Sequence, residues 1–111
     1  MKEGVKKVNS RLVVKYVPLD SLRHPENNPR KWTEEARKSL KESIKRHGIL
    51  DPLVVNNAPG REGIIIGGNF RAEVLKEMGI DTVPVVHITI ADPKKEAEII
   101  IRLNKNVGEF D

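Results

Sequence analysis

The sequence predicts a single domain of the α+β class. Its 111 residues are enough for one compact core, but two cores would both lack apolar surface. Short apolar runs rich in valine and isoleucine, which favour strands, occur alongside segments with apolar residues every three or four positions, which favour helices. Clusters of glycine, proline and asparagine separate these segments and mark turns.

Four segments are predicted to be β-strands. They cover residues 12–17, 53–55, 64–66 and 82–90, and each is bounded by proline, glycine or another turn residue. Residues 53–55 and 64–66 are apolar without interruption. This pattern indicates strands that are buried on both faces.

The first predicted helix has local signals at both ends. Thr33 can cap its start, and Gly48 can end it. Between them, Ala36, Leu40 and Ile44 recur every four residues and form the apolar stripe that we expect to face the domain.

Two further helices are predicted in the second half of the chain. One begins after Asn69, interpreted as its cap, and ends at Gly79. The other begins with Asp92 as the cap and Pro93 in the first helical position, and it runs to about Asn104. Its apolar residues are Ala97, Ile100, Ile101 and Leu103.

The composition excludes several classes of site. Cysteine is absent, so disulfides, thiolate zinc sites and cysteine nucleophiles are impossible. The three histidines lack the spacing of a local metal motif, and we expect no metal site. No apolar run approaches the ~18 residues of a membrane span. A cytoplasmic protein without membrane contact is expected.

Positive charge is concentrated in the first half of the chain. Residues 1–47 contain 13 Lys or Arg and six acids, whereas residues 48–111 contain seven and ten. We interpret residues 1–10 as a flexible basic leader and 11–111 as the domain. Weak DNA contact and a merely solvated basic face both remain open. The candidate DNA-binding residues are Lys6, Lys7, Arg37, Lys41 and Lys45.

A candidate anion site lies at residues 67–71, Gly67-Gly68-Asn69-Phe70-Arg71. A buried strand, two glycines and a helix start can direct free backbone N–H groups at one point, and Arg71 can add a bidentate contact to phosphate. The alternative is a tight strand-to-helix connection with no ligand. Short glycine motifs alone do not decide between the two.

The order of motifs over a longer stretch resembles a known family. Segments 23–30, 48–55, 65–71 and 79–85 are together similar to the N-terminal domain of ParB proteins, and to the ParB-like domains of phage and DNA-methyltransferase-associated proteins. The resemblance extends over residues 11–111. It implies the ParB/sulfiredoxin fold, a small mixed sheet flanked by about three helices. It also leaves open that the domain is cut from a longer protein.

The resemblance implies that the turn binds nucleotide phosphates, as the equivalent turn binds CTP in ParB partition proteins. Gly68 and Arg71 match that pattern, but Asn69, Phe70 and Glu73 stand where the family has an acid and two arginines. Two positive charges are lost. The expected cofactor is a nucleoside diphosphate or triphosphate, with Mg²⁺ as an open question. Sulfiredoxin chemistry is excluded, because Asn69 stands where sulfiredoxin has its cysteine.

Four residues outside the turn are further candidates by resemblance. Asn28 and Arg30 belong to the loop that faces the turn in this fold, and Asn104 ends the helix whose neighbours close over the nucleotide in ParB relatives. In the similar free serine kinases an acid in this loop activates a hydroxyl, so Glu26 is the candidate general base. A solvated surface glutamate is the alternative for Glu26.

The leading hypothesis is a nucleotide-binding domain of a DNA partition, DNA modification or transcription-related protein, with nucleotide, DNA and a partner domain or second copy as partners. Whether it is an enzyme is left undecided. The alternatives are a phosphotransferase, a nucleotide hydrolase or a nuclease of the same fold, and a purely structural interaction domain.

Overall fold

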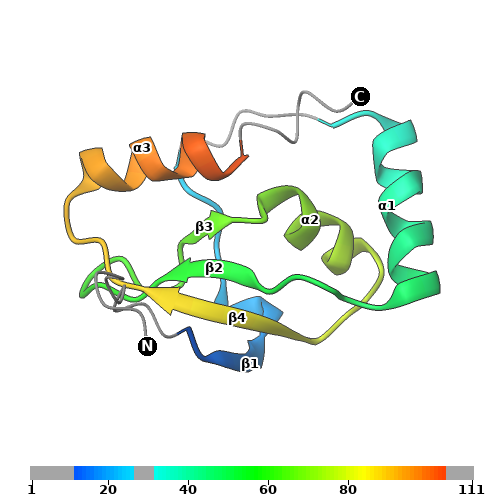
Figure 1. The fold of residues 1–111 in the computed structure, drawn as a ribbon, viewed down its shortest axis with the longest axis horizontal. Coiled ribbons are helices and arrows are strands. Elements are labelled where there is room, and N and C mark those ends of the chain that lie inside the picture. Colours follow the sequence, from blue (N-terminus) through cyan, green and yellow to red (C-terminus); the bar gives the residue numbers. More distant parts are fainter. Residues whose placement is uncertain (1–11, 27–31, 105–111) are drawn as a thin grey trace, which may run out of the picture.

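The computed structural model describes residues 12–26 and 32–104, which contain four strands and three helices (Figure 1). In chain order the elements are β1 (Val14–Pro18), a 3₁₀ turn (Leu19–Ser21), α1 (Glu34–His47), β2 (Leu53–Asn56), β3 (Ile65–Gly67), α2 (Asn69–Glu77), β4 (Thr82–Ile88) and α3 (Pro93–Asn104). Every predicted strand and helix is therefore present. The last strand ends at Ile88 rather than at Ile90.

The strands form one mixed sheet in the order β1-β4-β2-β3. β1 runs antiparallel to β4 and β3 antiparallel to β2, whereas β2 and β4 are parallel. A parallel pair requires a crossover, and here the chain between β2 and β4 passes through β3 and α2. This topology confirms the α+β class with a mixed sheet and three helices.

The core lies between the sheet and α2. Residues 64–66 are fully buried, as the apolar run predicted. From α2, Ala72 and Leu75 join the strand residues, and burying each large apolar side chain contributes roughly 1.5–3 kcal/mol. The buried cluster consists of Leu19, Leu53, Val55, Ile65, Ala72, Leu75, Val83 and Val85.

Helix α1 packs on α2 rather than deep in the core. The Thr33 hydroxyl accepts a hydrogen bond from the Ala36 N–H at 3.0 Å, which confirms the predicted cap. Gly48, with φ of 80°, ends the helix, as predicted. The predicted stripe, which includes Leu40 and Ile44, is only half-buried. None of the residues of α1 is fully buried.

The apolar residues of α3 are at most half-buried. Ala97 is exposed, and Ile101 and Leu103 keep 68% and 49% of their surface exposed, whereas the fully buried residue of α3 is Glu96. The start of the helix was predicted correctly, because the Asp92 side chain accepts a hydrogen bond from the Lys94 N–H at 3.0 Å. The helix therefore turns a carboxylate, rather than its apolar stripe, toward the sheet.

The buried carboxylate of Glu96 is hydrogen-bonded within a polar network. The fully buried Asn56 at the end of β2 donates from Nδ2 to Glu96 Oε2 at 2.6 Å and to the Ile90 carbonyl at 2.9 Å. Its Oδ1 accepts from the N–H groups of Ala58 and Ile90. Arg61 donates to both Glu96 oxygens, at 2.6 and 3.0 Å. These contacts, with the hydrogen bond from Arg61 largest, lower the pKa of Glu96.

Candidate functional site

The turn between β3 and α2 leaves the start of α2 uncapped by any side chain. Gly68, with φ of 94° and ψ of 24°, occupies the N-cap position in the left-handed conformation. Asn69 is therefore the first residue of the helix, and the prediction that its side chain caps α2 is wrong. Because glycine has no capping side chain, the N–H groups of Asn69, Phe70 and Arg71 lack an intrahelical acceptor and remain for a ligand.

The Asn69 side chain instead anchors the turn to β3 and to His24. It is buried, and its Nδ2 donates to the Ile65 carbonyl at 3.1 Å. Its Oδ1 lies 2.6 Å from His24 Nδ1. Since Oδ1 can only accept, His24 Nδ1 carries the proton of this hydrogen bond. The contact joins residues 45 positions apart, and no local pattern in the sequence points to His24.

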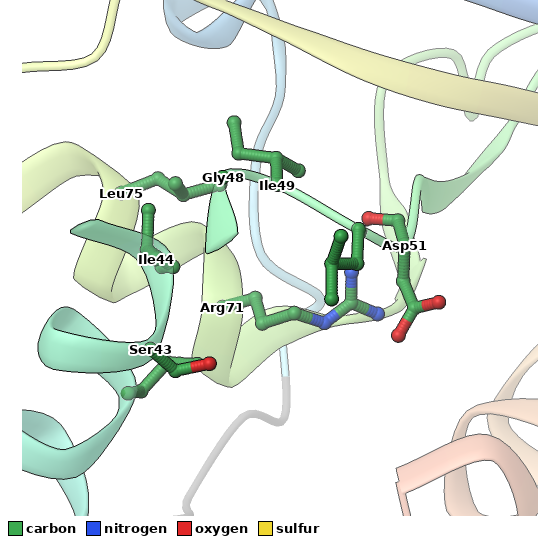
Figure 2. Close-up of a pocket in the computed structure, with 9 residues that line it drawn as sticks. Ser43, Ile44, Gly48, Ile49, Asp51, Arg71 and Leu75 are labelled. Atoms are coloured by element: carbon green, nitrogen blue, oxygen red, sulfur yellow. Dashed lines mark hydrogen bonds between the residues drawn. The ribbon is translucent and has the colours of Figure 1, made fainter. Parts of the chain in front are cut away.

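Arg71 holds the loop before β2 against the start of α2. Its Nη1 donates to the Asp51 carbonyl at 2.7 Å, and Figure 2 shows the two residues side by side. The same atom donates more weakly to the Pro52 carbonyl at 3.4 Å. Partial burial lowers the pKa of Arg71, and the Asp51 carboxylate partly offsets this effect. Guanidinium groups remain charged in proteins, so a positive charge lies beside Gly68.

An apolar cavity of about 110 Å³ opens next to this arginine (Figure 2). Its walls come from the second half of α1, the following loop and one face of α2, and Arg71 links the cavity to the helix start. The lining residues are Leu40, Ser43, Ile44, Gly48, Ile49, Leu50, Asp51, Arg71 and Leu75. A ligand with an anionic group and a flat apolar part could occupy both places.

Phe70 contributes its ring to packing. It stacks on Trp32, with ring centroids 4.8 Å apart and an interplanar angle of 29°. The backbone N–H of Phe70 is therefore the group that a ligand can reach at this position. Trp32 also has a buried Nε1 without a hydrogen-bond partner among the described residues.

Asn104, predicted near the nucleotide, lies against the strand that leads into the turn. Its Nδ2 donates to the Ile66 carbonyl at 2.9 Å and to the Ile100 carbonyl at 2.6 Å. Leu103 adds a contact, because a Cβ built on Gly67 would lie 3.2 Å from Leu103 Cδ1. The end of α3 is thus tied to the last residues of β3, immediately before Gly68.

Glu26 lines a different cavity. This polar cavity of about 270 Å³ is bordered by Arg23, His24, Glu26, Gly60, Arg61 and Ile64, and it shares no residue with α2. The role of Glu26 as a general base stays a prediction. Asn28, Arg30, Lys6 and Lys7 lie outside the described residues.

Two members of the predicted DNA-binding stripe on α1 are engaged in ion pairs with α2. Arg37 contacts Glu73 at 2.5 Å and also Glu77, and Lys41 contacts Glu77 at 3.0 Å. The hydrogen bond with Glu73 is the main reason that the pKa of Arg37 is raised. Lys45 is exposed and has no ion pair among the described residues, and its contact with DNA stays a prediction.

Two further features concern residues 12–26 and 32–104 only. No helix in this part of the chain has the length and apolar character needed to cross a membrane. No three histidine or acidic side chains of these residues are grouped so that they could hold a metal ion.

Comparison with known proteins agrees with the fold. A family model described as the ParB N-terminal domain matches residues 2–107. A probable chromosome-partitioning protein ParB of Pseudomonas putida is 28% identical over 99 residues, which cover 88% of this chain and 33% of that protein. The chain thus spans a third of the length of this curated relative.

Two solved structures show the same architecture. One is the C-terminally truncated chromosome-partitioning protein ParB of Caulobacter crescentus complexed with CTP-γ-S. It has a TM-score of 0.70 and is 28% identical in sequence, and the match covers 89% of this chain and 55% of that one. Sulfiredoxin from Arabidopsis thaliana has a TM-score of 0.64 at 23% identity, over 82% and 99% of the two chains, and supports the fold alone. The matched family model and the shared fold show that this chain belongs to the ParB N-terminal domain family.

Proposed function

We propose that this domain binds a nucleotide, with the phosphates at the start of α2 and the base in the apolar cavity between α1 and α2. The proposal rests mainly on one observation. The start of α2 has no side-chain cap, and it lies beside the cavity together with Gly68 and the cation Arg71. Free N–H groups and the helix dipole favour an anion at this point. The complex of Caulobacter ParB with CTP-γ-S supports the same class of ligand.

The phosphates would be held more by backbone groups than by side-chain charge. Phe70 and Glu73, which stand where the resemblance implies arginines, are engaged with Trp32 and Arg37. Among the described residues of the turn, Arg71 therefore supplies the positive charge. The exposed Asp51 carboxylate lies near it and partly offsets this charge. Mg²⁺ bound together with a diphosphate or triphosphate would offset the remaining negative charge.

We further propose that the domain serves a DNA partition, DNA modification or transcription-related protein in the cytoplasm, together with a partner domain or a second copy. Lys45 and the leader lysines Lys6 and Lys7 would supply weak contacts to DNA phosphates. Such contacts do not depend on sequence and weaken steeply as salt rises.

The nucleotide proposal is tested by thermal unfolding with ATP, ADP, CTP and GTP, each with and without Mg²⁺. A ligand that binds only the folded state, present at 100 times its Kd, stabilises that state by about 2.7 kcal/mol. At least one nucleotide is expected to raise Tm by several degrees or more. Unchanged Tm values across the whole panel at millimolar nucleotide would contradict the proposal.

Replacing Arg71 by alanine is expected to weaken nucleotide binding by about tenfold to a hundredfold. The change removes a charge-assisted contact worth roughly 1.5–3 kcal/mol and releases the loop at Asp51. Isothermal titration calorimetry measures the loss. The matched control is Arg46→Ala, which removes an exposed arginine of α1, outside the turn. Arg30→Ala is expected to weaken binding less than Arg71→Ala. Equal losses in the Arg71 and Arg46 variants would refute this role.

A further inference from the structure

The second, polar cavity lies beside Ile64, just before β3, and His24 connects its wall to Asn69 of the turn. It has a volume of about 270 Å³, and Arg23, His24, Glu26 and Arg61 contribute its polar side chains. The backbone of Arg23 is fixed there: its N–H donates to the Gly63 carbonyl at 2.9 Å, and its carbonyl accepts from the Ile65 N–H at 2.9 Å. The side chain of Arg23 therefore starts from a rigid position beside the sheet.

The cavity contains more positive charge than its inner partners neutralise. Arg61 uses Nε and Nη2 for Glu96, and this carboxylate is buried. Arg23 forms no ion pair with any described residue, and its side chain donates a weak hydrogen bond to the Gly60 carbonyl at 3.5 Å. Arg23 also contributes to the lowered pKa of Glu96, so both guanidinium groups lie near this single carboxylate. Glu96 and Glu26 together match the charge of the two arginines, but among the described residues neither carboxylate forms an ion pair with Arg23.

His24 and Glu26 complete the surroundings. The hydrogen bond from His24 Nδ1 to Asn69 fixes the imidazole, and in the neutral ring Nε2 is then an acceptor, so His24 shapes the cavity wall without donating to an anion. Glu26 is exposed, and its carboxylate lies close enough to Arg61 to contribute to the raised pKa of that arginine. Glu26 is thus the one group on this cavity that opposes an anion.

We propose that this cavity is a second anion site, in which the guanidinium of Arg23, with Arg61 beside it, binds a phosphate group. A planar guanidinium matches two phosphate oxygens, and an arginine outside any ion pair gives up no existing salt bridge when it binds. The proposal goes beyond the nucleotide site, because no residue of α2 lines this cavity. The remaining volume would accept the small molecule that carries the phosphate.

The test is a nitrogen-15 NMR titration of the full chain with inorganic phosphate at constant ionic strength. We expect saturable shifts of the Gly60, Arg61 and Ile64 amides. Arg23→Ala should weaken this binding by about tenfold or more, since it removes a charge-assisted contact. Glu26→Gln should strengthen it about two- to fivefold, because it removes a repelling surface charge. Both residues are exposed, so neither change should unfold the domain.

Two matched variants distinguish this site from a general loss of positive charge and from the nucleotide site. Arg46→Ala removes an equally exposed arginine from α1 and should leave the shifts of Gly60, Arg61 and Ile64 unchanged. Arg71→Ala should also leave them unchanged, even where it abolishes nucleotide binding, so failure of one site is distinguishable from failure of the other. The proposal is overturned if phosphate causes no saturable shift at these amides, or if Arg23→Ala and Arg46→Ala weaken binding equally.

Discussion

Replacing Asn56 by alanine is expected to lower the free energy of unfolding by roughly 3–5 kcal/mol, a large part of the 5–15 kcal/mol typical of a domain. Asn56 is fully buried and makes four hydrogen bonds, to Ala58, Glu96 and both backbone groups of Ile90. Alanine would leave these buried groups without partners. Such groups are costly, because the unfolded chain satisfies them with water.

Urea unfolding followed by circular dichroism measures this loss. Asn57→Ala is the matched control, because Asn57 is the exposed neighbour of Asn56 and its hydrogen bond to the Ile88 carbonyl uses only the backbone. The control should change stability by less than about 0.5 kcal/mol. Similar midpoints for the two variants would show that the polar network does not hold α3 against the end of β2.

Replacing Gly68 by alanine is expected to abolish measurable nucleotide binding and to cost about 2–4 kcal/mol of stability. The positive φ disfavours any residue with a Cβ, by roughly 1–2 kcal/mol. A Cβ at this position would also lie 2.6 Å from Leu53 Cδ2 and 2.9 Å from Arg71 Nη2. Overpacking of this kind costs roughly 1–3 kcal/mol, and its relief would displace the cation at the helix start.

Gly79→Ala separates backbone strain from damage to the site. Gly79 has a similar φ of 76°, but a Cβ there would meet nothing within 4 Å. This control should lose only the strain energy and should bind nucleotide as the parent chain does. Calorimetric titration at a temperature where both variants are folded gives the comparison. Retained binding in Gly68→Ala would mean that the ligand does not approach this turn.

Local signals in the sequence predicted the elements well. Thr33 and Asp92 cap their helices through hydrogen bonds to N–H groups only two or three residues away, and Gly48 ends α1 with a positive φ. Such contacts depend on neighbours in the chain and can be recognised from residue type and spacing. The continuous apolar run at residues 64–66 likewise indicated a strand buried on both faces.

Contacts between distant residues could not be predicted in the same way. The sequence placed Asn56 in a turn and indicated no role for Glu96, although the two are hydrogen-bonded across 40 positions. Their pairing places Glu96 on the buried side of α3, whereas Ile101 and Leu103 remain exposed. Apolar periodicity alone cannot identify a buried polar partner.

The strand-to-helix turn at residues 67–71 was predicted correctly, but the roles of its side chains were only partly predicted. The glycine pair and Arg71 do form a helix start with an adjacent cation. Asn69 was expected to cap the helix, yet its side chain is buried against His24 and Ile65. The left-handed backbone of Gly68 shifts the helix start by one residue, and a glycine pair does not reveal which of its members adopts that conformation.

A nitrogen-15 NMR titration of the unmodified chain with CTP and Mg²⁺ decides most directly whether nucleotide phosphates bind at the start of α2. Saturable shifts of the Asn69, Phe70 and Arg71 amides are expected, accompanied by shifts of Ile49 and Leu75 in the apolar cavity. If CTP, and ATP or GTP in its place, leave these amides unmoved at millimolar concentration, or shift only residues remote from the turn, the start of α2 is not a nucleotide site.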